Sequence, residues 1–186
     1  NFYWSIENVV NSNNSLRNNL NKNFLDEKEN LKKLLEKTVA KQTISDVEVG
    51  SFLSGGIDSS LISAILSKYS KKKIKTFTVG FENRNYDESK QAKKISNYLN
   101  TDHYEYYMSK IDLISAADNL HLIYNEPFAD SSQLPTYLIS KLMKKETKVI
   151  LSGDGGDELF GGYNRYIYLQ KIKSYSKNLP EYLKRN

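Results

Sequence analysis

Short segments with the pattern of β-strands alternate with helical segments along most of this sequence, and this alternation restricts the fold more than any other feature. Strands are predicted at residues 47–53, 74–81, 103–108 and 148–153. Helices are predicted at residues 26–42, 59–70, 87–99, 111–124 and 133–145. Strands that alternate with helices form βαβ units, in which neighbouring strands are parallel. The sequence therefore predicts an α/β fold with a doubly wound parallel sheet.

Two glycine-rich loops follow the first and the fourth predicted strand. They have the sequences SGGIDSS at 54–60 and SGDGGDELFGGY at 152–163. In an open parallel sheet, ligands bind outside the carboxyl ends of the strands, where the strand order reverses. We expect the strand order 3-2-1-4, in which the first and fourth strands are neighbours and both loops border one crevice.

The first loop lies between a strand and the start of a helix. A helix N-terminus carries free N–H groups and a partial positive charge, which favour a phosphate group. Gly55 and Gly56 allow a close backbone approach, and serine hydroxyls can donate to phosphate oxygens. The loop contains no lysine, so a metal would have to balance the phosphate charge, and Asp58 is placed to hold Mg²⁺. The alternative is an ordinary tight turn with Asp58 or Ser59 as the helix N-cap.

The second loop carries three carboxylates, from Asp154, Asp157 and Glu158. The calcium-binding pattern of an EF-hand fails, because Gly156 stands where its second ligand should be. The simplest alternative is a flexible acidic turn. Beside a phosphate site, however, these carboxylates would repel the phosphates unless Mg²⁺ lay between them. Two such loops in one crevice predict a site for a nucleotide and a metal ion.

The composition excludes several other classes of protein. The chain of 186 residues is 39% hydrophobic and has no cysteine, so disulfides and thiolate metal sites are excluded. The lack of cysteine is compatible with a reducing cytosol, and we expect a cytoplasmic protein. No apolar run is long enough to span a membrane. The net charge is +5, but the one dense basic run, Lys71 to Lys73, falls at a predicted helix end, and no RNA-binding motif is present. We therefore expect neither a nucleic-acid partner nor a membrane partner. We also expect His103 and His121 to have structural roles.

The two loops resemble those of a known family. SFLSGGIDSS is similar to the pyrophosphate-binding loop of the N-type (PP-loop) ATP pyrophosphatases. Together with SGDGGDELFGGYNRY, it resembles the synthetase domain of the glutamine-dependent asparagine synthetases, and TFTVGF, YDES, EPFADSS and PTYL are also similar to that family. The resemblance implies adenylation of the aspartate side-chain carboxylate with Mg·ATP, release of pyrophosphate, and amidation of β-aspartyl-AMP by ammonia.

The resemblance also implies roles for individual residues. Asp154 matches a carboxylate that is expected to be catalytic in the second half-reaction, although relatives often carry Glu there. Asp58 and Asp157 match the metal-binding carboxylates. The positions that match ATP contacts are Leu53, Ser54, Gly55, Gly56, Asp58, Ser59, Ser60, Val79, Ser152 and Gly153. Leu53 and Val79 would act through their backbone groups on the adenine.

The domain organisation follows from the same resemblance. We expect a linker and an N-terminal helix in residues 1–44, an ATP pyrophosphatase-type synthetase domain in 45–168, and the start of a helical C-terminal region in 169–186. Family members carry an N-terminal glutaminase domain with a cysteine nucleophile, and a lysine well beyond the GGYNRY motif. We expect this chain to be a piece of such a protein that lacks both parts. By itself, such a piece is not expected to make asparagine. A homodimer is an expectation for the full-length protein only.

Two other classes stay open. One is another adenylating enzyme of the superfamily, such as a β-lactam synthetase relative or a tRNA-modifying pyrophosphatase. A tRNA-modifying enzyme would need an added basic RNA-binding element. The other is a non-catalytic nucleotide-binding module.

Overall fold

The structure is a computed structural model that describes residues 3–14, 23–81, 87–127, 129–130 and 132–176. The chain divides into two compact units, Asn1–Lys41 and Gln42–Asn186. The helix α1 (Ile6–Asn14) lies in the first unit, which also contains nearly all of α2 (Phe24–Gln42). Every strand of the sheet lies in the second unit. The fold and the site described below belong to the second unit.

Four parallel strands form the sheet. They are β1 (Val49–Phe52), β2 (Lys75–Phe81), β3 (Asp102–Met108) and β4 (Val149–Leu151). Their order is β3-β2-β1-β4, which confirms the predicted order 3-2-1-4. All three neighbouring pairs are parallel. The carboxyl ends of β1 and β4, where the two glycine-rich loops begin, therefore lie side by side at the edge where a doubly wound sheet binds ligands.

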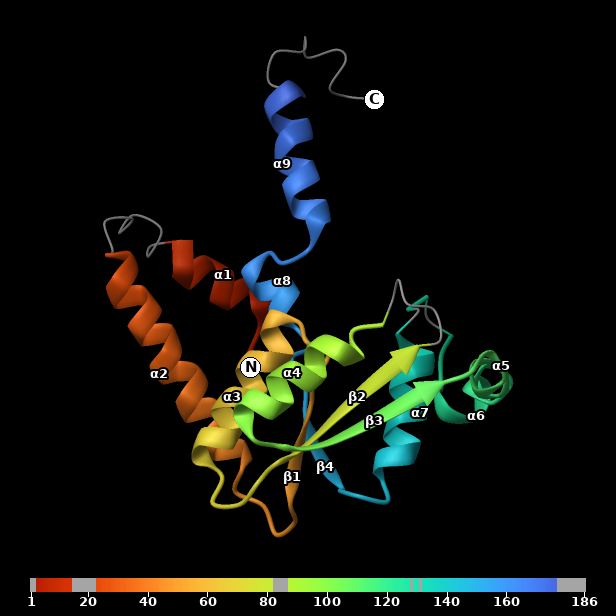
Figure 1. Ribbon diagram of the computed structural model, residues 1–186. Coiled ribbons are helices and arrows are strands. Elements are labelled where there is room, and N and C mark those ends of the chain that lie inside the picture. The colour runs from red at the N-terminus through yellow and green to blue at the C-terminus, as the bar shows by residue number, and fades with distance from the viewer. Residues whose placement is uncertain (1–2, 15–22, 82–86, 128, 131, 177–186) are drawn as a thin grey trace. The chain divides into compact units, whose positions relative to one another are not determined.

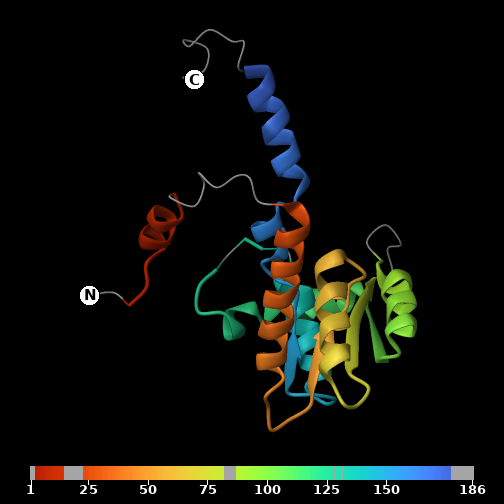
Figure 2. The same cartoon turned by 90° about the vertical axis from the view of Figure 1, so that its left-hand side faces the viewer.

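Helices cover both faces of the sheet (Figures 1 and 2). One face carries α3 (Ile57–Tyr69) and α4 (Ser89–Leu99). The opposite face carries α5 (Lys110–Asp118), α6 (Leu120–Ile123) and α7 (Gln133–Met143). The short helix α8 (Gly156–Phe160) and the helix α9 (Asn164–Ser176) follow β4. The predicted doubly wound architecture is confirmed.

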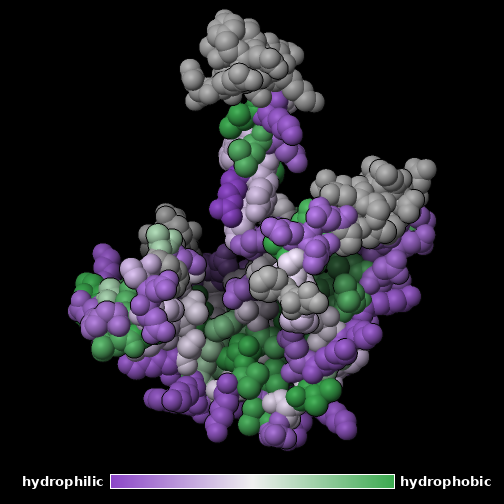
Figure 3. Space-filling model, turned by 180° about the vertical axis from the view of Figure 1, so that it is seen from behind, coloured by the Kyte–Doolittle hydropathy of each residue, from purple (hydrophilic) through white to green (hydrophobic). Residues whose placement is uncertain are grey.

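The face under α7 holds an apolar core. Phe77, Met108, Ile139 and Met143 form a buried cluster there, each 4% exposed or less. Full burial of one such side chain contributes about 1.5–3 kcal/mol to stability. Viewed from the α7 side, hydrophobic side chains gather in the middle of the molecular face and hydrophilic ones surround them (Figure 3).

The face under α3 and α4 contains buried hydroxyl groups. Ser51 on β1 and Ser63 on α3 are both fully buried, and their hydroxyl oxygens lie 2.9 Å apart in a hydrogen bond. Thr76 on β2 is also fully buried, and its hydroxyl lies 2.8 Å from that of Thr101. Because each buried hydroxyl needs a partner, the Ser51–Ser63 contact ties α3 to β1, and the Thr76–Thr101 contact ties the segment between α4 and β3 to β2.

Several predicted boundaries are wrong. The single helix predicted over 111–124 is divided into α5 and α6 at Asn119, whose side-chain amide donates to the Ser115 carbonyl at 2.6 Å. Asparagine side chains that bind nearby carbonyls compete with the backbone ladder and favour helix ends. The first and fourth strands are shorter than the predicted 47–53 and 148–153, as β1 and β4 show.

Three helices were not predicted as such. The weakly periodic N-terminal segment contains α1, the acidic loop contains α8, and α9 extends across the boundary predicted at residue 168. The last ten residues, 177–186, lie outside the described part. Among the helices that are described, none combines the length and the apolar character needed to cross a bilayer.

Candidate nucleotide-binding site

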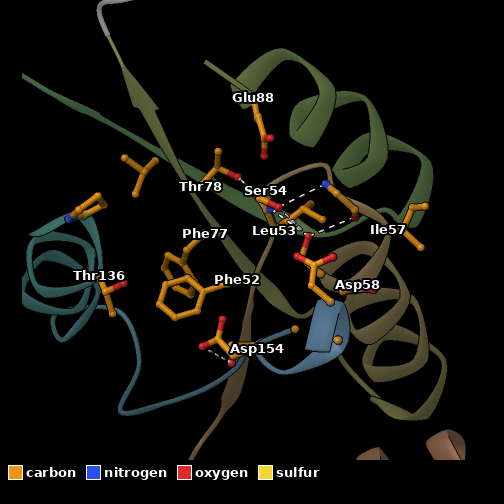
Figure 4. Close-up of a pocket in the computed structure, with 18 of the residues that line it drawn as sticks. Phe52, Leu53, Ser54, Ile57, Asp58, Phe77, Thr78, Glu88, Thr136 and Asp154 are labelled. Carbon is orange, nitrogen blue, oxygen red and sulfur yellow. Dashed lines mark hydrogen bonds between the residues drawn. The ribbon is translucent and has the colours of Figure 1, made fainter. Parts of the chain in front are cut away.

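A cavity of about 800 Å³ lies at the carboxyl ends of β1, β2 and β4. Its walls come from the first loop, the start of α3, the carboxyl half of β2, the N-terminal half of α7 and the loop that follows β4. Figure 4 shows Asp58 and Ser54 on the α3 side, Thr136 across the cavity on α7, and Phe52 and Phe77 between them. The cavity therefore has an apolar wall of aromatic rings beside a polar wall of hydroxyls and carboxylates.

Nearly all the residues predicted from the sequence border this one cavity. The lining includes Leu53, Ser54, Gly56, Asp58, Ser59, Val79, Ser152, Gly153, Asp154 and Asp157. Gly55 and Ser60 are not among the lining residues. The Ser60 hydroxyl instead donates to the Gly56 carbonyl at 2.6 Å, and Gly55 packs against α4. Both residues therefore support the conformation of the loop from outside the cavity.

Internal hydrogen bonds hold the first loop in a tight turn. The Ser59 hydroxyl accepts from the Ser54 amide at 3.2 Å and lies 3.0 Å from the Ser54 hydroxyl. The Ser54 hydroxyl also accepts from the Gly56 amide at 3.2 Å. These bonds place the two hydroxyls next to each other at the cavity wall before any ligand binds.

No side chain caps the start of α3. Its N-cap is Gly56, and the structure gives that residue no side-chain cap hydrogen bond. The alternative in which Asp58 or Ser59 serves as the N-cap is therefore wrong, because the helix already begins at Ile57. An uncapped N-terminus leaves N–H groups available to an anionic ligand in the cavity.

The second loop packs directly against the first. A β-carbon added at Gly153 would lie 2.8 Å from the Ser59 amide nitrogen, and one added at Gly156 would collide with the Asp58 carboxylate. One added at Gly162 would collide with the Asp157 carboxylate. The glycines of the second loop thus make room for the two acidic side chains that the sequence predicts as metal ligands.

Further hydrogen bonds organise the second loop. The Ser152 hydroxyl donates to the Asp154 carboxylate at 3.0 Å, and the Tyr163 hydroxyl donates to the Glu158 carboxylate at 2.5 Å. The bond to Glu158 raises the pKa of Tyr163 to about 12, and the same bond lowers the pKa of Glu158. The Arg165 guanidinium carbon lies 4.1 Å from the centre of the Tyr163 ring, within cation–π range.

Asp58 and Asp157, the predicted metal ligands, both line the cavity and could hold a metal ion there. Mg²⁺ in nucleotide sites commonly takes one or two carboxylates and completes its shell with phosphate oxygens and water. Among the described residues, no three His, Cys, Asp or Glu side chains are arranged to hold a metal ion. The donor set is therefore too small for a closed protein site but fits one completed by phosphates.

A second cavity of about 590 Å³ adjoins the first. Both are lined by Thr136, Gly153, Asp154 and Asp157. The remaining walls of the second cavity include Tyr124, Asp130 and Tyr163. The Asp130 carboxylate accepts from the Ser132 amide and hydroxyl, each at 2.8 Å, and these bonds lower the pKa of Asp130. The two cavities therefore lie on either side of the same four residues.

Sequence reasoning missed much of the apolar wall and the contribution of α4. Phe52, Phe77, Thr78, Phe81, Glu88, Pro135, Thr136 and Ile139 line the cavity without having been predicted. Thr78 donates a hydrogen bond to the Leu53 carbonyl, while the Leu53 amide donates to the Phe77 carbonyl at 2.9 Å. Thr78 and Phe81 could have been predicted as lining residues, because they lie in the carboxyl half of the second strand, next to the edge where ligands bind.

The fold is that of the PP-loop, adenine nucleotide α hydrolase-like proteins. An NH3-dependent NAD synthetase from Campylobacter jejuni superposes with a TM-score of 0.51 and 16% identity, covering 73% of this chain and 60% of that one. An NMN synthetase from Francisella tularensis gives a TM-score of 0.50 and 16% identity, covering 70% of this chain and 58% of that one. At these identities the likeness concerns the fold alone.

Sequence comparison defines the family. The family model described as asparagine synthase matches residues 30–186. A Methanocaldococcus jannaschii protein, named among the glutamine-hydrolyzing asparagine synthetases, is 41% identical over 154 residues, which cover 82% of this chain and 30% of that protein. The glutamine-hydrolyzing asparagine synthetase 1 of Bacillus subtilis is 38% identical over 141 residues, covering 76% of this chain and 22% of that protein. The chain belongs to the asparagine synthase family, and it spans less than a third of either relative.

Proposed function

We propose that this chain is the ATP-binding part of an asparagine synthetase. In that reaction, the side-chain carboxylate of aspartate attacks the α-phosphorus of ATP, the bond to pyrophosphate breaks, and β-aspartyl-AMP forms. Ammonia then attacks the acyl carbon, and AMP leaves. The observation that supports this most is the contact between the two loops, because it puts an uncapped helix N-terminus and two carboxylates at one cavity.

The polar wall of the cavity suits the pyrophosphate group. The start of α3 provides free N–H groups and a partial positive charge, and the hydroxyls of Ser54 and Ser59 lie 3.0 Å apart beside it. Asp58 and Asp157 would hold magnesium, which supplies electrostatic stabilisation of the leaving pyrophosphate. The further polar contacts proposed for ATP are Gly56, Ser152 and Gly153, which line the cavity. Gly55 and Ser60 do not line it, so their proposed role is to shape the loop that binds the phosphates.

The apolar wall suits the adenine base. Phe52, Phe77 and Ile139 line it, and aromatic and aliphatic surfaces remove a base from water. We propose that the backbone of Leu53 and Val79 holds the base edge. The Leu53 carbonyl already accepts from Thr78, but a carbonyl oxygen has a second lone pair available.

The adjoining cavity is the proposed entrance for the acceptor amino acid. Asp154 lines both cavities, so it borders the place where an acceptor in one would meet a nucleotide in the other. This position supports the catalytic role proposed for Asp154 in the amidation step. The names of the relatives support glutamine as the source of ammonia. A glutaminase domain would then lie outside the described residues, and a homodimer stays a proposal for the full-length protein.

Titration of Mg·ATP into the chain tests the proposal. We expect saturable, magnesium-dependent binding by calorimetry, and a loss of at least tenfold in affinity for Asp58→Asn and for Asp157→Asn. Asp118→Asn is a matched control, because Asp118 is an exposed carboxylate at the end of α5 and lines neither cavity. Magnesium-independent binding, or equal losses in all three variants, would contradict the proposed site. Aspartate-dependent exchange of pyrophosphate into ATP then tests the acceptor against other carboxylic acids.

A further inference from the structure

Helix α4 rests on the sheet through unusually small side chains. Its buried residues are Ser89, Ala92 and Ser96, each 1% exposed or less. The large apolar residues Ile95 and Leu99 of this helix are only partly buried, so the contact gains less hydrophobic free energy than a fully buried apolar face would. Its specific polar contacts therefore contribute to the position of α4 together with this packing.

Those polar contacts come from one face of β3. The Lys93 ammonium lies 3.0 Å from Oε1 of Glu105, and the Tyr107 hydroxyl donates to Oε2 of the same carboxylate at 3.0 Å. The Tyr107 hydroxyl also lies 3.1 Å from the Ser89 hydroxyl, at the start of α4. Burial raises the pKa of Glu105, but the hydrogen bonds from Lys93 and Tyr107 lower it more, so this pKa lies below its ordinary value. Glu105 and Tyr107 together therefore hold α4 at two points.

Further contacts join the same face of β3 to β2. The Tyr107 ring packs over Gly80, where an added β-carbon would lie 2.5 Å from the ring. The His103 side chain is 7% exposed, its Nδ1 lies 2.9 Å from the Thr76 hydroxyl, and its Nε2 has no hydrogen-bond partner. Glu105 Oε1 is 3.9 Å from that Nε2, beyond hydrogen-bond distance.

The same end of α4 supports the nucleotide loop. Gly55 has a φ of +90°, and a β-carbon there would lie 3.0 Å from Cβ of Gln91 and 3.2 Å from the amide nitrogen of Ala92. Glu88, the N-cap of α4, lines the nucleotide cavity. Any displacement of the N-terminal half of α4 would therefore reach both the loop and the cavity wall.

We propose that Glu105 and Tyr107 are positioning residues for the nucleotide loop: they hold α4 through Lys93 and Ser89, and α4 holds the loop at Gly55. Neither residue lines the nucleotide cavity, so they act only through the helix. The effect on ATP binding rests on the proposed function, but the effect on the loop itself does not.

The test is the substitution Tyr107→Phe, which removes one hydroxyl from a side chain that is 59% exposed. Tyr98→Phe is the matched control, because Tyr98 lies on α4 with its side chain 88% exposed. Glu105→Gln is a second variant that keeps the shape of the side chain and removes its charge. Hydrogen exchange by mass spectrometry is measured on peptides covering 53–61 and, as an internal reference, 136–143, together with the Kd for Mg·ATP.

We expect Tyr107→Phe and Glu105→Gln to speed exchange in 53–61 by about threefold to tenfold, the range of one or two net hydrogen bonds, and to weaken Mg·ATP binding similarly. Exchange in 136–143 should not change, and Tyr98→Phe should match the wild type. Unchanged exchange in 53–61 in both variants would overturn the inference, as would an equal rise in 136–143, which indicates general destabilisation. If the wild type binds no Mg·ATP, the proposed function fails, while the exchange result still decides the role of Glu105 and Tyr107.

Discussion

The substitution Gly153→Ala should separate the two loops at their closest backbone contact. The added β-carbon would lie 2.8 Å from the Ser59 amide nitrogen and 3.0 Å from the Asp58 carbonyl carbon, and ordinary van der Waals contact begins at 3.4 Å. Because both neighbours are backbone atoms in the first turn of α3, no side chain can rotate out of the way. One loop must therefore move by about 0.6 Å relative to the other.

The expected cost follows from that displacement. Overpacking of a close-packed contact typically costs about 1–3 kcal/mol. We therefore expect a similar loss in the free energy of unfolding, measured by urea denaturation. The Kd for Mg·ATP should rise by at least about tenfold, because a misplaced helix N-terminus and Asp58 lose charge-assisted contacts worth about 1.5–3 kcal/mol each.

Gly155→Ala is the control for this experiment. Gly155 has a φ of +87° but no atom within 4 Å of an added β-carbon. Alanine there pays left-handed strain of about 1–2 kcal/mol without a collision. We expect lower stability but a Kd close to that of the wild type at a temperature where the variant is fully folded. Wild-type affinity in Gly153→Ala, or an equal loss in both variants, would refute the shared loop contact as the basis of binding.

Two further predictions concern stability. Burial lowers the pKa of His103 below 6.5, so below about pH 6.5 the unfolded chain binds its proton more readily than the folded chain. The free energy of unfolding should therefore decrease as the pH falls below about 6.5. Urea denaturation at pH 5 and pH 7.5 measures this decrease, and His103→Asn should make it smaller. A decrease of the same size in His103→Asn would assign the pH dependence to other groups. Met143→Ala should lower the free energy of unfolding by about 2–5 kcal/mol, because Met143 is 3% exposed in the apolar cluster. The Kd for Mg·ATP should not change under conditions where the variant is fully folded. A higher Kd would show that this core also shapes the site.

The sequence was sufficient to predict a parallel sheet, and the expected order 3-2-1-4, which the structure confirms, implies that the two loops meet. Alternation of strands and helices forces parallel pairing, and glycine-rich loops after the first and fourth strands then mark the edge where ligands bind. The structure brings Gly153 against Ser59 and Gly156 against Asp58, as that reasoning requires. The roles of the individual site residues stay predictions, to be tested by the variants above.

The rest of the site depends on tertiary contacts that no local pattern encodes. The division at Asn119 changes where the chain leaves α5, so the direction of α7, and with it Thr136 and Ile139 at the cavity, could not be derived from periodicity. The role of Gly156 and Gly162 was also missed. Local reasoning explains glycine by turn geometry, whereas here the missing β-carbons leave space for the carboxylates of Asp58 and Asp157.

The different composition of the two sheet faces has a consequence for mutational tolerance. Under α7, the cluster around Phe77 and Met143 can exchange one apolar side chain for another of similar volume at a cost of usually less than about 1.5 kcal/mol. Under α3, the Ser51–Ser63 pair has no apolar substitute that preserves its 2.9 Å hydroxyl contact. A single substitution of Ser51 or Ser63 leaves the other buried hydroxyl without its partner, so it should be tolerated less well than an apolar exchange in the α7 cluster.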